Sequence, residues 1–513
     1  LACFAREQLA PEAGGVKADK QWKEHLARMA KATEYVPRLP GTLQAELRDY
    51  QLEGFEWLAR LAHWGVGACL ADDMGLGKTL QALALILLRA PQGPTLVVAP
   101  TSVCMNWMSE AARFAPTLKV KLFGAGERAA MLDEAEAFDL VIVSYGLLQL
   151  EAPLFAARQW TTIVLDEAQA IKNTATKRSQ AVMALQGDFR MVATGTPLEN
   201  HLGELWNLFR FINPGLLGTS DQFNLRFAGP IERAQDKRAE AGARTRLRRL
   251  IQPFILRRTK AQVLSELPPR TEIVLPVELT QEETALYESL RREALEKLAA
   301  LEAPENAAAP GQNSIQILAE MMKLRRACCN PALVAPELGL VSSKLTVFAR
   351  LIDDLLENRH KVLVFSQFVD HLTLIRRHLD ARGIAYQYLD GSTPMAERKA
   401  RVDAFQAGSG DVFLISLKAG GVGINLTAAD YVIHMDPWWN PAVEDQASDR
   451  AHRMGQQRPV TIYRLVARHT IEEGIVELHK HKRDLADGLL EGSDMSARMS
   501  PTDMLRMLQE GMA

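Results

Sequence analysis

Eight consecutive residues in the first fifth of the chain have the types and spacing of a phosphate-binding loop. The segment Asp72-Asp73-Met74-Gly75-Leu76-Gly77-Lys78-Thr79 lies between an apolar run, residues 66–70, and a helical pattern, residues 80–88. Glycines before a helix N-terminus let backbone N–H groups point at phosphate oxygens, Lys78 can reach the β- and γ-phosphates, and the Thr79 hydroxyl can hold Mg²⁺. Aspartate stands at position 72, where the strict pattern has glycine. The loop predicts a site for a nucleoside triphosphate.

A pair of acidic residues, Asp166 and Glu167, follows the apolar run at residues 162–165. At the end of a buried strand, Asp166 would hold Mg²⁺ through water and Glu167 would polarise the water that attacks the γ-phosphate. Adjacent acids are also common at solvated strand ends. The pair follows the glycine-rich loop within the length of one α/β domain, which favours the catalytic interpretation.

Length and composition predict a large globular protein of several domains. The chain has 513 residues, 47% of them apolar, and no apolar run approaches the roughly 20 residues that span a bilayer. We therefore expect no membrane segment. The five cysteines are odd in number and scattered, which favours a reducing compartment and argues against structural zinc: Cys3, Cys69, Cys104, Cys328 and Cys329.

The chain begins at Leu1 without a methionine or a secretory signal, so we expect a fragment of an intracellular protein, in the cytoplasm or nucleoid, or in the nucleus of a eukaryote. Its net charge is −2, but residues 244–260 contain seven basic side chains and no acid. This basic stretch could follow a phosphate backbone, or it could be a solvated helix face.

Strand-length apolar runs alternate with helical patterns in two series, which predicts two α/β domains with parallel sheets. The first series is Leu96–Ala99, Leu140–Ser144, Ile163–Leu165 and Met191–Ala193, and the second is Val362–Phe365, Tyr386–Leu389, Val412–Ile415, Val432–His434 and Thr461–Leu465. Residues 205–340, between the two series, have a largely helical pattern interrupted by prolines.

The second domain has no phosphate loop, but Arg450 and Arg453 lie near its end, three residues apart. This spacing would put both on one helix face. A guanidinium that contacts a phosphate stabilises transition-state charge, so this domain could complete the first domain's site. The alternative is that both arginines are ordinary surface charges.

These motifs, in this order, resemble the superfamily-two helicases and, more narrowly, the Swi/Snf-type double-stranded DNA translocases. The set comprises Gln51, DDMGLGKT (72–79), APTSVCMNW (99–107), DEAQ (166–169), ATGTPLEN (193–200), VLVFSQF (362–368), LISLKAGGVGINLTAAD (414–430) and DQASDRAHRMGQ (445–456). The narrower resemblance is carried by LRDYQLEGFEWL (47–58), FILRRTK (254–260), LPPR (267–270) and DPWWNP (436–441). It covers roughly residues 40 to 480.

The resemblance implies an α/β fold of two RecA-like parallel-sheet lobes with helical insertions between them. The expected domains are a lead-in (1–40), an ATP-binding lobe 1 (41–204), a first helical insertion with a basic linker (205–270), a second helical insertion (271–341), lobe 2 with the arginine fingers (342–486) and a C-terminal tail (487–513).

The resemblance also implies ATP and Mg²⁺ as ligands. Lys78, Asp166, Glu167, Arg450 and Arg453 would be catalytic, and Thr79 and Asp166 would hold the metal. Gln51, helped by Arg48, would contact adenine. The remaining residues expected at the nucleotide are Asp72, Met74, Gly75, Leu76, Gly77, Lys78, Thr79, Gln169, Gly423 and Gln446.

Polar residues in or beside the motifs would contact DNA phosphates, which position a duplex without specifying its sequence. They are Ser102, Asn106, Trp107, Ser144, Tyr145, Asn173, Thr196, Ser366, Gln367, Ser392 and Lys418; for each, a structural role in its loop is the alternative. Thr194 and Thr196 would couple the nucleotide site to DNA. Trp438 and Trp439 fit packing better than base stacking.

Three departures from the family pattern leave the carboxylates and arginines intact. Gln169 stands where a histidine is frequent, Ser448 and Asp449 replace a small pair, and the turn after Cys329 lacks the family's histidine, which argues against a metal there.

We therefore expect a DNA-dependent ATPase that moves along double-stranded DNA without separating the strands. Its partners would be duplex DNA and a DNA-bound protein, it would act as a monomer, and the lack of accessory modules favours a prokaryotic origin. The alternatives are a strand-separating DNA or RNA helicase and a nucleic-acid-dependent switch that binds ATP and rarely hydrolyses it.

Overall fold

The computed structural model describes residues 28–479, apart from residues 29–30, 33, 125–127, 172, 196–201, 233–236, 265–266, 303–309 and 421–423. The chain forms two compact units, with the change from unit 1 to unit 2 at residues 265–266. Each unit contains one parallel β-sheet. Within the described ranges, every helix is too short or too polar to cross a lipid bilayer.

Unit 1 contains a seven-stranded parallel sheet in the order β3-β4-β2-β5-β6-β1-β7. The strands are β1 (Ala68–Leu70), β2 (Thr95–Ala99), β3 (Lys119–Leu122), β4 (Asp139–Ser144), β5 (Gln159–Asp166), β6 (Gln186–Ala193) and β7 (Ile255–Leu256). The central strands β2, β4 and β5 are almost completely buried and each contains an apolar run, as expected of a parallel sheet covered on both faces.

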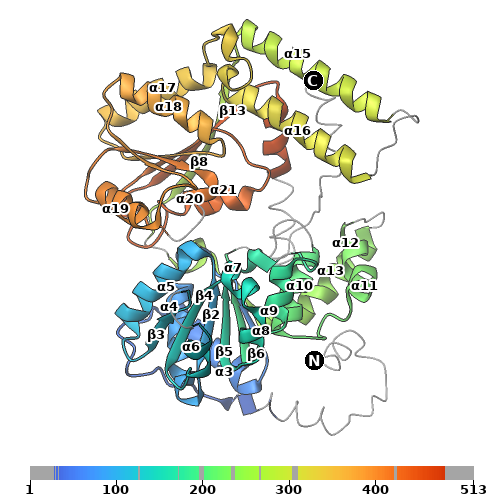
Figure 1. Cartoon of the computed structure of the whole chain (residues 1–513), viewed down its shortest axis with the longest axis vertical. Helices are drawn as coiled ribbons and strands as arrows, with labels where there is room; N and C mark the ends of the chain where they lie inside the picture. Colours follow the sequence, from blue (N-terminus) through green and yellow to red (C-terminus); the bar gives the residue numbers. More distant parts are fainter. Residues whose placement is uncertain are drawn as a thin grey trace. The chain divides into compact units, whose positions relative to one another are not determined.

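The helices of unit 1 connect these strands (Figure 1). They are α3 (Asp49–Trp64), α4 (Lys78–Arg89), α5 (Thr101–Phe114), α6 (Arg128–Asp133), α7 (Tyr145–Leu150), α8 (Ala152–Ala156), α9 (Lys177–Met183), α10 (Leu202–Ile212), α11 (Ser220–Phe223), α12 (Gly229–Glu232), α13 (Lys237–Ile251) and α14 (Lys260–Val263), with shorter turns η1 (Ala90–Gln92), η2 (Ala168–Ile171), η3 (Asn224–Ala228) and η4 (Gln252–Phe254). Helix α4 is apolar on nearly all sides and buried from Gln81 to Leu87. This burial holds the preceding loop against the sheet.

Unit 2 contains a six-stranded parallel sheet in the order β10-β11-β9-β12-β13-β8. Its strands are β8 (Arg270–Val277), β9 (Val362–Ser366), β10 (Tyr386–Leu389), β11 (Val412–Ser416), β12 (Tyr431–His434) and β13 (Val460–Ala467). Successive side chains of β9 enter two different cores: Leu363 and Phe365 pack in one, Val362 and Val364 in the other.

The helices of unit 2 cover both faces of its sheet and add a projecting pair. They are α15 (Gln281–Glu302), α16 (Pro310–Cys329), α17 (Ser343–Glu357), α18 (Val369–Ala381), α19 (Met395–Gln406), α20 (Leu417–Gly420) and α21 (Pro441–Ser448), with η6 (Pro331–Leu333) and η7 (Pro336–Leu338). Ion pairs from Glu293 to Lys323 and from Lys297 to Glu320 show that α15 and α16 run antiparallel, as drawn in Figure 1.

The predicted fold class is confirmed, and each of the nine predicted strand segments forms a strand. The region predicted as largely helical, residues 205–340, also contains two strands that were not expected. Residues 255–256 form β7 at the edge of the first sheet, and residues 270–277 form β8 at the edge of the second. Strand β8 is rich in β-branched residues and pairs with β13 along its whole length, and its edge position tolerates Pro276.

Candidate functional site

The glycine-rich loop joins β1 to α4, as its sequence predicts. Gly75 and Gly77 have φ of 88° and 75°, a left-handed conformation that suits glycine, and Gly77 is the N-cap of α4. The Lys78 ammonium donates to the carbonyl oxygens of Asp72 (2.6 Å) and Asp73 (3.2 Å). A Cβ placed on Gly195, after β6, would lie 3.8 Å from this nitrogen. The loop therefore has the helix N-terminus and the positive charge that phosphate binding needs.

The Asp72 side chain is held by Arg258, and the contact of Asp72 with nucleotide stays a prediction. Its carboxylate is fully buried and accepts two hydrogen bonds from the Arg258 guanidinium, at 3.0 and 2.6 Å, and one from the Arg258 backbone N–H. Arg258 also donates to Gln81 and lies over the Tyr50 ring. Aspartate at this position ties the loop to the segment before α14.

Helix α3 holds the opposite side of the loop. The carbonyl oxygen of Leu76 accepts hydrogen bonds from the Tyr50 hydroxyl (3.1 Å) and the Gln51 amide (3.2 Å), while the Gln51 amide oxygen accepts from the Arg48 backbone N–H. Gln51 is buried and the Arg48 side chain is exposed. The predicted nucleotide residues Gln51 and Leu76 are thus brought together, and contact of Gln51 and Arg48 with adenine stays a prediction.

The carboxylate of Asp166, at the end of β5, lies in a hydrogen-bonded pocket. It accepts from the Trp107 indole N–H (2.8 Å) and from the Glu167 backbone N–H (2.9 Å). Burial, followed by the charge of neighbouring Glu167, raises the pKa of Asp166 to about 7, against the opposing effects of Trp107 and Lys78. Trp107 is 0% exposed. In this structure the indole orients the carboxylate, and its contact with DNA stays a prediction.

Glu167 begins a short hydrogen-bonded path between two motifs. Its φ of 49° is unusual for a side chain with a Cβ, and its carboxylate accepts from the Gln169 amide N–H (2.9 Å). The Gln169 amide oxygen accepts from the Thr194 hydroxyl at 3.4 Å. The path joins the acidic pair to the residue after β6, the connection expected of a group that couples nucleotide to another ligand.

The residues predicted for Mg²⁺ have suitable chemistry. A carboxylate and a hydroxyl are hard oxygen donors, and the buried Asp166 carboxylate beside Glu167 is a position where a cation would offset the cost of burying negative charge. Thr79, at the second position of α4, is half-buried.

Two other predicted DNA contacts in unit 1 are buried and have structural partners, which fits the alternative of a structural role; their contact with DNA stays a prediction. The Ser144 hydroxyl caps α7 by accepting from the Leu147 N–H (3.2 Å), and the Tyr145 hydroxyl donates to the Asp166 carbonyl oxygen (3.0 Å). Asn106 is half-buried and donates to Glu110, whereas Asn173 is exposed. Thr196 and the side chain of Ser102 lie outside the described residues.

The basic stretch, residues 244–260, is not one continuous basic surface. Arg244 is buried and paired with Glu240 at 2.7 Å, and Arg258 is buried against Asp72. Arg246 and Arg249 are exposed on α13. These two remain candidates for contact with a phosphate backbone.

In unit 2, α21 ends at Ser448, so Arg450 and Arg453 follow the helix and do not share a helix face. The helix is held in part by a hydrogen bond between Ser448 and His434 at 2.8 Å, and Asp449 is its C-cap. Arg450 is buried and Arg453 half-buried. Gln446 is half-buried on α21, and Gly423 lies outside the described residues. The roles of these residues at ATP stay predictions.

Arg270, the first residue of β8, contacts the segment that contains Arg450, and this role was not predicted. It contacts Asp445 at 2.7 Å and Asp449 at 3.3 Å. Burial alone would lower the pKa of Arg270, but the carboxylates around it raise it. The edge strand therefore holds the acidic side chains next to Arg450 in place. The motif LPPR (267–270) was the available sequence signal.

The hydroxyl of Ser366, a predicted DNA contact, is buried and donates to Asp436 at 2.5 Å, which fits the alternative of a structural role; its contact with DNA stays a prediction. Gln367 is half-buried and accepts from Arg325 at 3.2 Å. The Arg325 guanidinium lies 5.3 and 5.0 Å from the ring centres of Trp438 and Trp439, so the tryptophans pack against a buried cation. Ser392 and Lys418 are exposed.

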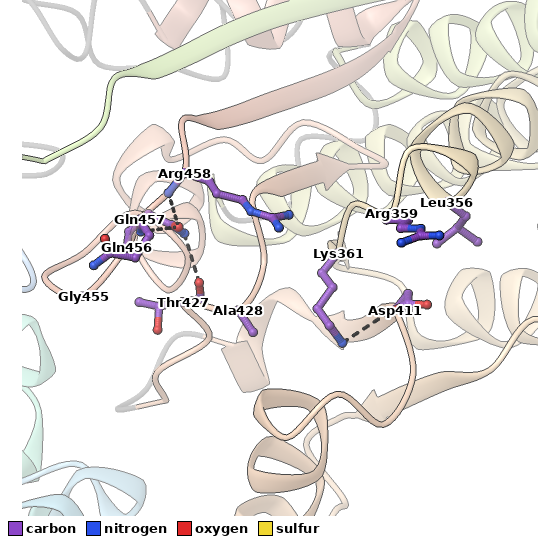
Figure 2. A pocket seen from close by; sticks show the side chains of 10 residues that line it. All are labelled: Leu356, Arg359, Lys361, Asp411, Thr427, Ala428, Gly455, Gln456, Gln457 and Arg458. Carbon is purple, nitrogen blue, oxygen red and sulfur yellow. Dashed lines mark hydrogen bonds and ion pairs between the residues drawn. The ribbon is translucent and has the colours of Figure 1, made fainter.

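Unit 2 also has a cavity of about 520 Å³ away from these residues (Figure 2). It is lined in part by Arg359, Lys361 and Arg458, with Asp411 in reach of Lys361 at 3.4 Å. Lys361 precedes β9 and Asp411 precedes β11, so the cavity lies at the amino ends of the strands. The predicted contacts Ser366 and Lys418 lie at the carboxyl ends. This cavity is therefore separate from the candidate site.

Two family models match most of the chain, and the first of them extends past residues 265–266 into unit 2. The SNF2-related domain matches residues 50–333, and the helicase conserved C-terminal domain matches residues 343–455. A putative ATP-dependent helicase/translocase of Bacillus subtilis, YwqA, is 38% identical over 93% of this chain and 53% of its own length. The human SWI/SNF-related matrix-associated actin-dependent regulator of chromatin subfamily A member 1 is 36% identical over 91% of this chain and 46% of its own length.

A solved structure, the Sulfolobus solfataricus SWI2/SNF2 ATPase core in complex with dsDNA, is 34% identical, with a TM-score of 0.45, over 92% of this chain and 97% of that one. The chain spans about half the length of the curated relatives it matches. Because the SNF2-related domain matches more than half of its 513 residues, and the phosphate loop and acidic pair of unit 1 have the expected geometry, the chain belongs to the SNF2-related family.

Proposed function

We propose that the chain is the catalytic core of an ATP-driven motor that moves along double-stranded DNA and remodels protein–DNA complexes without separating the strands. The observation that carries this proposal is the hydrogen-bonded path Glu167–Gln169–Thr194 beside the Lys78 loop. The path begins at Glu167, the group suited to activating water, and ends at Thr194, in the motif expected to respond to DNA.

ATP is the substrate in this proposal. Lys78 would exchange its bonds with the Asp72 and Asp73 carbonyls for phosphate oxygens. Glu167 would accept a proton from the attacking water, because its carboxylate is held by Gln169 next to the loop. Bound at Thr79 and Asp166, Mg²⁺ would supply charge neutralisation of the phosphates. Arg450 and Arg453 would stabilise the charge that develops on the transferred group.

Duplex DNA is the proposed partner because the name of one similar protein refers to chromatin, and that of another to a complex with dsDNA. The exposed predicted contacts Asn173, Ser392 and Lys418 offer an amide, a hydroxyl and an ammonium to phosphate oxygens. Such contacts hold a backbone without reading bases. A DNA-bound protein would be the load, and we propose that the motor acts as a monomer.

The test is ATP hydrolysis without nucleic acid and with duplex DNA, single-stranded DNA or RNA, at one fixed low salt concentration because phosphate contacts weaken with salt. We expect the largest stimulation by duplex DNA, followed by displacement of a triplex-forming strand from a duplex. The control is Glu167→Gln, which should bind the same DNA without hydrolysing ATP.

Other outcomes would overturn the proposal in distinct ways. Stimulation chiefly by single strands or RNA, with separation of a labelled duplex, would identify a strand-separating helicase. ATP binding with negligible turnover on every polymer would identify a nucleotide-dependent switch.

A further inference from the structure

Three buried side chains of unit 2 bring together one sulfur, one nitrogen and one oxygen ligand. Cys329 is the last residue of α16, His371 lies in the first turn of α18, and Asp436 follows β12. The Cys329 Sγ, a His371 ring nitrogen and an Asp436 carboxylate oxygen all lie within 4.8 Å of one another. Cys329 and His371 are 0% exposed and Asp436 is 2% exposed. The cluster is separate from the nucleotide residues of unit 1.

His371 supplies an independent indication of a missing ligand. Both of its ring nitrogens are buried, and no described residue is their hydrogen-bond partner. A neutral imidazole has one donor and one acceptor, and burying both unpaired costs free energy. Its side chain faces Cys329 and Asp436, so a bound species between the three would satisfy one of these nitrogens.

The other two ligand residues are already held in position. The Asp436 carboxylate accepts from the Ser366 hydroxyl (2.5 Å) and from the Gln367 backbone N–H (3.3 Å). The Cys329 carbonyl oxygen accepts from the Ser342 hydroxyl at 3.3 Å, which fixes the end of α16. Outer hydrogen bonds of this kind orient the ligands of metal sites.

We propose that Cys329, His371 and Asp436 bind a divalent transition-metal ion of the zinc class, with water as the fourth ligand. Cysteine, histidine and aspartate are all zinc ligands, with bonds of about 2.0 to 2.3 Å. Tetrahedral bonds of this length put ligand atoms closer together than 4.8 Å, so modest side-chain rotations would close the site. The sulfur and nitrogen ligands select against Mg²⁺ and Ca²⁺, which prefer oxygen.

Binding of the ion requires the thiolate form of Cys329. Burial, followed by the charge of the Asp436 carboxylate, raises the pKa of the Cys329 thiol well above its usual value, while the charges of Lys344 and Arg325 act in the opposite direction. Metal binding breaks the Cys329 S–H bond, releases that proton to solvent and forms a metal–thiolate bond. The thiolate and the carboxylate together neutralise the two charges of the ion.

The ion would connect three segments that are distant in sequence: the end of α16, the start of α18 and the turn after β12. Because Asp436 also holds Ser366 and Gln367, the site would fix the loop that follows β9. The sequence has no local cysteine and histidine spacing that would predict this site, since each of the three segments contributes one ligand.

The test uses the whole 513-residue chain, purified without chelator. Elemental analysis by mass spectrometry should find one equivalent of metal per chain. The metal-free protein, titrated with Co²⁺, should gain a thiolate-to-cobalt charge-transfer band and tetrahedral d–d bands that saturate at one equivalent. Zn²⁺ at a hundredfold excess over its Kd should raise the Tm of unit 2 by about 5 to 10 °C.

The decisive variants are Cys329→Ala and His371→Leu, with Cys328→Ala as the matched control in the same helix. His371→Leu replaces an unpaired buried ring with an apolar side chain, so circular dichroism should show a folded protein. Both ligand variants should lose the cobalt bands and bind Zn²⁺ at least tenfold more weakly, whereas Cys328→Ala should keep both properties. Cobalt bands of full strength in both ligand variants would place the metal elsewhere. A parent chain without metal and without cobalt bands would mean that the cluster holds only water.

Discussion

The indole of Trp107 acts on the acidic pair although it lies in a motif expected to contact DNA. It is fully buried and donates to the Asp166 carboxylate at 2.8 Å. Tyr145 donates to the carbonyl of the same residue, at 3.0 Å. Both aromatic side chains therefore position the end of β5. Any effect that they have on DNA binding would be indirect, through the nucleotide site.

Trp107→Phe should slow ATP hydrolysis and leave DNA affinity unchanged. The substitution keeps an aromatic ring, although a smaller one, and removes a hydrogen bond to a charged group, which is worth about 1.5–3 kcal/mol. If this bond acts in the transition state, kcat should fall by about tenfold to a hundredfold. Steady-state kinetics and DNA-binding anisotropy would measure the two effects separately. A loss of DNA affinity with normal kcat would restore Trp107 to the DNA surface.

Lys78→Ala and Glu167→Gln should separate binding from chemistry. Removing the Lys78 ammonium should abolish ATP binding, because no other charge of the loop reaches the phosphates. Glu167→Gln keeps the side chain's size and its bond with Gln169, but it removes the base, so turnover should fall by about 10² to 10⁴-fold with ATP still bound. A fluorescent ATP analogue and phosphate release are the readouts. Comparable turnover in Glu167→Gln would remove Glu167 from the role of base.

At the scale of elements, one guanidinium ties together helix α3, the phosphate loop and the edge strand β7. Arg258 donates to Asp72 and Gln81 and lies over Tyr50. A Cβ added to Gly54 in α3 would lie 2.7 Å from this guanidinium, so only glycine permits the helix to pack this closely. The family signature FILRRTK is explained here by packing within unit 1.

Arg258→Met should destabilise unit 1 by about 3–5 kcal/mol, because it leaves the fully buried Asp72 carboxylate without its partner. Exposed Arg249→Met is the matched control and should change stability by less than about 0.5 kcal/mol. Urea unfolding followed by circular dichroism measures both. Equal stability of the two variants would show that the buried pair is dispensable.

The elements differ in how well the sequence predicts them. The central strands, such as β2 and β9, are continuous apolar runs whose burial depends on composition alone, and each was expected. Strands β7 and β8 were missed because each takes its hydrogen bonds from a strand distant in sequence. The phosphate loop and the acidic pair were predicted, since their chemistry is local. The partners of Asp72 and Asp166 were not, because Arg258 and Trp107 reach them only through the fold.

At the scale of the whole molecule, each unit has its own sheet and its own core, so each should unfold as a separate cooperative region. Unit 2 has a counterpart of the Arg258 pair: Lys344 and Glu472 are both 0% exposed and lie 2.6 Å apart. Burial alone would lower the pKa of Lys344, but Glu472 raises it. Each unit thus contains a buried ion pair whose disruption would leave a carboxylate unpaired.

Hydrogen exchange of two variants would test this independence. Arg258→Met should lower protection in β1 and β5 while β9 and β12 keep theirs, and Lys344→Met should do the reverse, because each substitution leaves a buried carboxylate unpaired in one unit. Mass spectrometry of peptides from each strand gives the readout, with the parent protein as reference. Loss of protection across both sheets in either variant would show a single cooperative unit.

The position of β8 has a consequence for biosynthesis. On the ribosome this strand emerges before the rest of its sheet, and its partner β13 is among the last elements to be made. Until then β8 is an unpaired, β-branched segment of the kind that joins foreign strands, and its Arg270, Glu272 and Pro276 discourage such joining. Unit 1 can complete its sheet once β7 has left the exit tunnel. Nascent chains should therefore gain nucleotide-binding capacity well before unit 2 is folded.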